Sequence, residues 1–325
     1  MNRKSCSCFK IIFPLIFVFC FASVFSAQEQ NKEKQAIFTV TVVDSNGKPI
    51  SDLKKENFTI YDEKTPQPIS YFKSGDEPAS IGILFDTSGS IKNDRNDNNP
   101  RFNMAREGLL RFINEANPAN EYFFVAFNKK PQLLLDFTQD KDAFFQTLKN
   151  LDAVKLRGNT DFYGTVYLGN EKLSQSKYQK RVLLILSDGY DNESNYKLNE
   201  VKDALKKSDV TIYAISIVES DLNADFSLSS AFGYRILGEI AEVTGGAAFY
   251  VKSFSEVKEA FNSIANLLRS QYRIGFIPDK TMPQKAKDKW RELKITVQEP
   301  KNTLTNSKKH IVIVRKGYYS NRINN

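Results

Sequence analysis

The chain has 325 residues, of which 41% are hydrophobic and 26% charged, and its formal net charge is +8 at neutral pH. This length allows about two domains, and this hydrophobic content excludes a generally disordered chain. The positive charge is mild and forms no basic stripe with interleaved stacking aromatics, so we expect no nucleic-acid partner.

Residues 1–27 have the pattern of a secretory signal peptide. Basic residues precede an almost wholly apolar run over 11–24, and Ser26-Ala27 offers small residues for cleavage. Because Pro14 interrupts a run that is already short for a membrane span, we expect cleavage and no transmembrane helix in the mature chain. All three cysteines lie within this segment, so the mature chain has no disulfide. We therefore predict an extracytoplasmic protein that is secreted, periplasmic or surface-associated.

Residues 28–78 follow a β pattern. Apolar residues alternate with their neighbours over 38–42, and two more short strands are expected over 58–61 and 69–72. The connection between these two contains Pro66.

Between residues 79 and 271 the sequence alternates between strands and helices, which predicts a mainly parallel sheet covered on both faces. Apolar runs indicate buried strands over 81–85, 182–186 and 210–218. A hairpin between 121–127 and 132–137 gives this sheet one antiparallel edge. The helical spacing of apolar residues predicts helices around 102–112, 198–205, 236–243 and 257–268.

From residue 272 the pattern returns to β, with strands expected over 272–277, 293–297 and 311–314. The flanks 28–78 and 272–325 are each too short to bury a good core, but together they have the size of a two-sheet sandwich, about 100 residues. We therefore predict an α/β fold, in which a doubly wound, mostly parallel sheet is inserted into a small β-sandwich formed by the two flanks.

The strongest functional signal is Asp86-Thr87-Ser88-Gly89-Ser90, which directly follows the buried strand over 81–85. Open α/β sheets bind their ligands beyond the carboxyl ends of their strands. Two later residues are placed to join this site, Thr160 in a polar loop and Asp188 after the strand over 182–186. The candidate ligands all offer oxygen, which suits Mg²⁺ or Mn²⁺ before zinc or copper: Asp86, Ser88, Ser90, Thr160 and Asp188.

This set resembles the metal-ion-dependent adhesion site (MIDAS) of von Willebrand factor type A (VWFA) domains. In that family a D-x-S-x-S motif, a later loop threonine and a later aspartate share one magnesium. The flanking strands and the terminal Lys316-Gly317-Tyr318-Tyr319 are similar to a bacterial exported subgroup. The resemblance implies a Rossmann-like sheet in which Ser88 and Ser90 coordinate the ion directly. It also implies that Thr160 binds directly or through water, and that the two aspartates act mostly through waters and hydrogen bonds.

The resemblance further implies adhesion-type binding of a protein partner. Neutral hydroxyl ligands leave the charge of the ion largely uncancelled, so an octahedral ion keeps an open position for an Asp or Glu carboxylate of that partner. Asp161, Tyr190 and Asp191 adjoin the site and are candidate partner contacts. Asp161 also fits a cap of the following helix, and Asp191 also fits a turn. The polar stretch over 220–233 is expected to line the metal face.

We do not expect an enzyme. Histidine occurs once, at His310, and the mature chain lacks cysteine, so a Cys–His pair and the usual zinc ligand sets cannot be built. Two other functions stay open at this point. One is a structural cell-envelope component in which the metal only stabilises the fold, and the other is a metal-assisted hydrolase that uses clustered aspartates.

Overall fold

The computed structural model describes residues 35–88, 100–153, 158–217, 228–278, 289–298 and 310–319. The expected signal peptide and the motif residue Ser90 lie outside these ranges. Within them, no helix is both long enough and apolar enough to cross a membrane.

A six-stranded sheet forms the centre of the fold, in the order β10-β9-β8-β5-β6-β7. Its strands are β5 (Ser80–Asp86), β6 (Glu121–Phe127), β7 (Pro131–Thr138), β8 (Arg181–Leu186), β9 (Val210–Ile217) and β10 (Ala247–Val251). All neighbours pair in parallel except β6 and β7, which pair antiparallel. Every residue of β5, β6 and β9 is buried, as expected for strands covered on both faces. The predicted sheet with one antiparallel edge is therefore confirmed.

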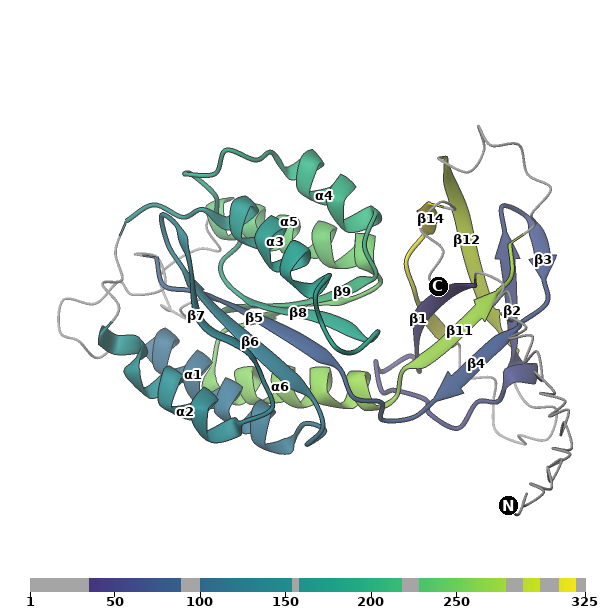
Figure 1. The fold of residues 1–325 in the computed structure, drawn as a ribbon, viewed down its shortest axis with the longest axis horizontal. Helices are drawn as coiled ribbons and strands as arrows, with labels where there is room; N and C mark the ends of the chain where they lie inside the picture. The colour runs from purple at the N-terminus through teal and green to yellow at the C-terminus, as the bar shows by residue number, and fades with distance from the viewer. Residues whose placement is uncertain are drawn as a thin grey trace, which may run out of the picture. The chain divides into compact units, whose positions relative to one another are not determined.

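Helices cover both faces of this sheet (Figure 1). They are α1 (Pro100–Glu115), α2 (Lys141–Lys149), α3 (Phe162–Leu173), α4 (Leu198–Lys206), α5 (Leu228–Thr244) and α6 (Phe254–Arg269), with a 3-10 turn η2 (Asn150–Ala153) after α2. Residues of α1, α2 and α6 join one hydrophobic cluster, and residues of α3, α4 and α5 join another on the opposite face. The polar stretch over 220–233 is partly helical, because its last six residues form the start of α5.

Two four-stranded antiparallel sheets are built from the flanks, in the orders β13-β1-β11-β4 and β14-β12-β2-β3. Their elements are β1 (Ala36–Val43), η1 (Lys55–Asn57), β2 (Phe58–Asp62), β3 (Thr65–Gln67), β4 (Tyr71–Ser74), β11 (Tyr272–Phe276), β12 (Trp290–Val297), β13 (Ile311–Ile313) and β14 (Gly317–Tyr319). Each sheet mixes strands from both flanks, and both contribute to one hydrophobic cluster. The predicted fold class is thus confirmed, while the domain boundaries at residues 27, 78 and 271 remain predictions.

One detail of the flank prediction was wrong. The connection that contains Pro66 is itself partly a strand, β3, which pairs with β2. Proline lacks a backbone N–H and is tolerated in strands at a sheet edge. Because β3 is an edge strand, Pro66 does not interrupt the pairing.

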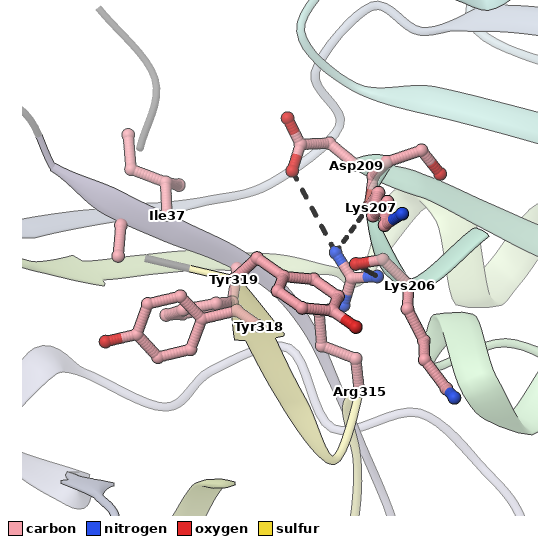
Figure 2. Close-up of a pocket in the computed structure, with 10 residues that line it drawn as sticks. Ile37, Lys206, Lys207, Asp209, Arg315, Tyr318 and Tyr319 are labelled. Carbon is pink, nitrogen blue, oxygen red and sulfur yellow. Dashed lines mark hydrogen bonds and ion pairs between the residues drawn. The ribbon is translucent and has the colours of Figure 1, made fainter. Parts of the chain in front are cut away.

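Arg315, between β13 and β14, ties the C-terminal flank to α4. Its guanidinium donates hydrogen bonds to the carbonyls of Leu205 (3.0 Å), Lys206 (3.3 Å) and Ser208 (2.6 Å), and it lies 3.9 Å from Asp209. Figure 2 shows this side chain reaching the end of α4. The last carbonyls of a helix lack intrahelical partners and carry partial negative charge, so a buried cation is stabilised there.

Candidate metal-ion site

Asp86 ends β5 and is almost completely buried, with 1% of its surface exposed. Its Oδ1 accepts a hydrogen bond from the backbone N–H of Ser88 (2.8 Å), and its Oδ2 accepts one from the hydroxyl of Ser187 (2.6 Å). Burial, followed by the charge of Asp188, raises the pKa of the Asp86 carboxyl to about 7. A buried carboxylate beside a second carboxylate is an arrangement that a cation stabilises.

Thr87, which directly follows Asp86, is anchored at the end of the neighbouring strand. The backbone N–H and the hydroxyl of Thr87 both donate to the carbonyl of Phe127, the last residue of β6, at 2.8 Å each. Ser88 is buried. Asp86 and Ser88 therefore lie at the carboxyl edge of the central sheet, where the sequence placed them, and Ser90 falls outside the described residues.

Thr160 is buried just before α3. Its N–H donates to Oδ1 of Asn192 (2.7 Å), and its carbonyl accepts from the N–H groups of Asn192 (3.1 Å) and Glu193 (3.2 Å). The next residue, Asp161, donates its N–H to the carbonyl of Asn128 (2.7 Å), directly after β6. Thr160 is thereby held between the end of β6 and the loop that follows β8.

Asp188 lies in that loop and is half-buried. Its Oδ1 accepts a hydrogen bond from the N–H of Tyr190 (3.0 Å). The backbone beside it lies directly against α5: a Cβ on Gly189, whose φ is +77°, would be 2.4 Å from the Gly233 carbonyl oxygen, and a Cβ on Gly233 would be 2.0 Å from the Asp188 carbonyl oxygen. Only glycine allows such a close approach, so α5 fixes the position of the Asp188 loop.

Hydrogen bonds therefore connect the three predicted segments around one edge of the sheet. The end of β5 is tied to the end of β6, the end of β6 to the Thr160 segment, and that segment to the loop after β8. The hydrogen bond from Ser187, directly after β8, to Asp86 connects the end of β8 back to the end of β5. Four of the five predicted ligands lie in these connected segments: Asp86, Ser88, Thr160 and Asp188.

The three residues predicted as partner contacts differ in their surroundings. Asp161 is the N-cap of α3, and Asp191 accepts hydrogen bonds from the N–H groups of Phe162 (2.8 Å) and Tyr163 (3.1 Å) at the start of that helix. Both carboxylates thus have a role within the fold. Tyr190, in contrast, is 44% exposed. Contact of any of the three with a partner remains a prediction.

The supporting contacts of three residues of the site were not predicted from the sequence, namely those of Ser187, Asn192 and Gly233. The Ser187 hydroxyl serves two neighbours, because it also accepts a hydrogen bond from the N–H of Gly189 (3.1 Å). The available signal for Ser187 was its place at the end of an apolar strand, directly before Asp188. Asn192 and Gly233 act through contacts with distant segments, which no local pattern reveals.

A doubly wound sheet with Asp86 and Ser88 at its carboxyl edge has the architecture of ligand-binding α/β domains, which bind beyond the carboxyl ends of their strands. The comparison with known families is specific: residues 80–263 match the von Willebrand factor type A domain. This match covers more than half of the chain, which therefore belongs to that family, and the resemblance inferred from the motif is confirmed. Because VWA domains mediate protein–protein interactions, the assignment supports an interaction role.

The chain is also similar to individual proteins. Among solved structures, the BatB protein of Bacteroides thetaiotaomicron is 15% identical with a TM-score of 0.45, and the match covers 60% of this chain and 100% of that chain. The PilB minor pilin of Streptococcus sanguinis is 15% identical with a TM-score of 0.47, and the match covers 62% of this chain and 63% of that chain. The vWF domain of the type V pili tip protein Mfa5 of Porphyromonas gingivalis is 14% identical with a TM-score of 0.46, and the match covers 58% of this chain and 94% of that chain. A Borreliella burgdorferi protein described as "Uncharacterized protein" is 27% identical over 206 residues, covering 59% of this chain and 60% of the relative. The chain thus spans less than two thirds of that relative.

Proposed function

We propose that this chain is an exported protein-binding protein whose VWA domain holds Mg²⁺ or Mn²⁺ and captures an acidic side chain of a partner through the ion. The proposed ligand set is Asp86, Ser88, Ser90, Thr160 and Asp188. Export is proposed from the N-terminal sequence pattern, which lies outside the described residues.

The observation that carries the proposal is the buried Asp86. Within the described part of the chain its hydrogen bonds come from Ser88 and Ser187, which are neutral donors, and the like charge of Asp188 raises its pKa further. Two carboxylates placed this way repel each other unless a proton or a cation compensates them. The surrounding hydroxyl oxygens favour a hard divalent cation.

The donor chemistry also favours binding of a carboxylate over catalysis. A bound divalent ion supplies positive charge that attracts an anionic side chain. The serine and threonine hydroxyls contribute no negative charge, so they leave that attraction largely intact. Asp86 is held by Ser187, and Asp188 by its loop against α5, and these fixed positions support the proposal of a preorganised site.

The test is capture of partner proteins from envelope and host-cell extracts, with the purified protein in Mg²⁺ or in EDTA. Two near-isosteric variants, Thr160→Val and Asp188→Asn, change only ligand atoms. Matched controls are Thr147→Val, a threonine bonded to its own helix α2, and Asp203→Asn, an aspartate on α4 paired with Lys206.

We expect specific partners that are recovered in Mg²⁺ by the wild type and both controls, and that are lost in EDTA and in both site variants. Circular dichroism shows whether each variant is folded. Recovery of every partner in EDTA, with the fold intact, would instead assign a structural role to the site.

A further inference from the structure

Two exposed aromatic residues are next in sequence to the contact between the Asp188 loop and α5. Tyr190 is 44% exposed and Phe232 is 48% exposed. Single apolar side chains on a surface need no explanation. These two, however, each adjoin a residue of the same close backbone contact, the one between Gly189 and Gly233. Tyr190 is two residues from Asp188 in the chain, and Phe232 directly precedes Gly233, which packs against the carbonyl of Asp188.

A cation accompanies this pair. The guanidinium carbon of Arg235 lies 4.9 Å from the centre of the Phe232 ring, and the Arg235 side chain is 58% exposed. Its Nη1 also pairs with Glu239 at 2.6 Å, one turn further along α5. The stacked guanidinium limits the motion of the ring, so less side-chain entropy is lost when a partner covers it. We call Tyr190, Phe232 and Arg235 the aromatic ledge.

Two other exposed side chains in the described part of the chain lack this combination. Tyr196 is stacked face to face on Tyr167, with ring centres 4.5 Å apart, so one face of its ring is already covered. Leu133 is as exposed as Phe232, at 49%, but it belongs to the edge strand β7. The ledge, in contrast, belongs to the two segments that meet at the contact between Gly233 and the Asp188 carbonyl.

We infer that the ledge is the second contact of the partner whose carboxylate is held at the metal. The occupant is an acidic segment of another protein that carries an aromatic or aliphatic side chain a few residues from the metal-bound Asp or Glu, since Tyr190 is itself two residues from Asp188. This inference rests on the proposed function and adds the specificity of the same site.

Interface energetics and charge agree with such an occupant. One carboxylate contact falls far short of a stable interface, which buries about 1,200–2,000 Å² in total. Tyrosine, other aromatics and arginine are the residues enriched in the energetically dominant parts of interfaces. Arg235 and Lys202 both pair with Glu239, so these three side chains keep a net positive charge. This charge adds to that of the ion and favours a segment with further acidic residues.

The experiment uses two capped peptides that differ in one residue, acetyl-Gly-Asp-Gly-Gly-Gly-amide and acetyl-Gly-Asp-Gly-Phe-Gly-amide. Peptide affinity is measured by NMR titration in Mg²⁺ and in EDTA, and Mg²⁺ affinity separately by calorimetry. The variants are Phe232→Ala and the equally exposed control Leu133→Ala.

We expect the wild type and Leu133→Ala to bind the phenylalanine peptide at least fivefold more tightly than the glycine peptide. Phe232→Ala should bind both peptides equally, with unchanged Mg²⁺ affinity. Equal affinity of the wild type for the two peptides, or a preference for the phenylalanine peptide that persists in Phe232→Ala, refutes the ledge as a partner contact. If peptide binding still depends on Mg²⁺ in that case, the proposed function stands. Peptide binding that is unchanged by EDTA, or no binding of either peptide, contradicts the proposed function and therefore also the role of the ledge.

Discussion

Helix α5 contains two glycines whose replacement by alanine should have opposite effects. A Cβ at Gly238 meets nothing within 4 Å, whereas a Cβ at Gly233 would lie 2.0 Å from the carbonyl oxygen of Asp188. Real Cβ atoms do not approach other heavy atoms within 3.0 Å, so Gly233→Ala forces the Asp188 loop or α5 to move by about 1 Å. If the position of that loop determines metal binding, this small change at a distant residue must weaken it.

The magnitudes follow from the two environments. Alanine in a helix interior is favoured over glycine by about 0.5–1 kcal/mol, so Gly238→Ala should be stabilised by that amount. Gly233→Ala gains the same helix propensity but loses about 1–3 kcal/mol to the clash, so it should be about 1–3 kcal/mol less stable than Gly238→Ala. Loss of support for a metal ligand typically lowers metal affinity about 10–100-fold.

Urea unfolding followed by circular dichroism measures the first effect, and calorimetric titration with Mg²⁺ measures the second. Gly238→Ala should bind Mg²⁺ as the wild type does. The reasoning fails if Gly233→Ala is as stable as Gly238→Ala and binds Mg²⁺ equally well, because the loop would then not be positioned by α5.

Three further predictions concern buried polar groups. Ser187→Ala should lower the free energy of unfolding by about 1–3 kcal/mol, because the Ser187 hydroxyl donates to the carboxylate of Asp86 and accepts from the N–H of Gly189. The exposed control Ser174→Ala should change the free energy of unfolding by less than about 0.5 kcal/mol. Burial lowers the pKa of Lys180 to about 8, so its charged form opposes folding below pH 8, and this penalty decreases between pH 8 and 10.5. The wild type should therefore gain stability relative to Lys180→Met as the pH rises from 8 to 10.5. A stability difference that stays constant over this range would refute the lowered pKa. Arg315→Met removes the hydrogen bonds to the last carbonyls of α4 and should cost about 2–3 kcal/mol in urea unfolding, whereas a change below about 0.5 kcal/mol would show that this contact does not stabilise the fold.

The sequence predicted the central sheet well for a physical reason. Parallel strands covered on both faces must be continuously apolar, and the buried runs of β5, β8 and β9 show this directly. Helix α3 was expected only through Asp161 as its cap, and its bounds were not predicted, because its sequence, Phe162–Leu173, carries two glycines and places apolar residues around much of its circumference. Helix α2 and strand β10 have only nine and five residues, which is too short for a clear periodicity.

The predicted metal ligands could be found from the sequence, but the residues that hold them in position could not. Asp86, Ser88 and Asp188 follow apolar strands, and that position predicts the carboxyl edge of a parallel sheet. The groups that hold them come from elsewhere in the chain, such as Asn192 against Thr160 and Gly233 against Asp188. These contacts arise only when distant segments pack, so spacing along the sequence carries no record of them.

The central claim is that this edge of the sheet binds one divalent ion and leaves a coordination position open. Water-proton relaxation with Mn²⁺ tests it most directly, because it reports both the bound ion and the exchangeable water that fills an open position. We predict one Mn²⁺ per chain that Mg²⁺ displaces, with an exchangeable water that acetate removes, and greatly weakened binding in Asp188→Asn. Absence of stoichiometric binding, or a bound ion without exchangeable water, would contradict the account.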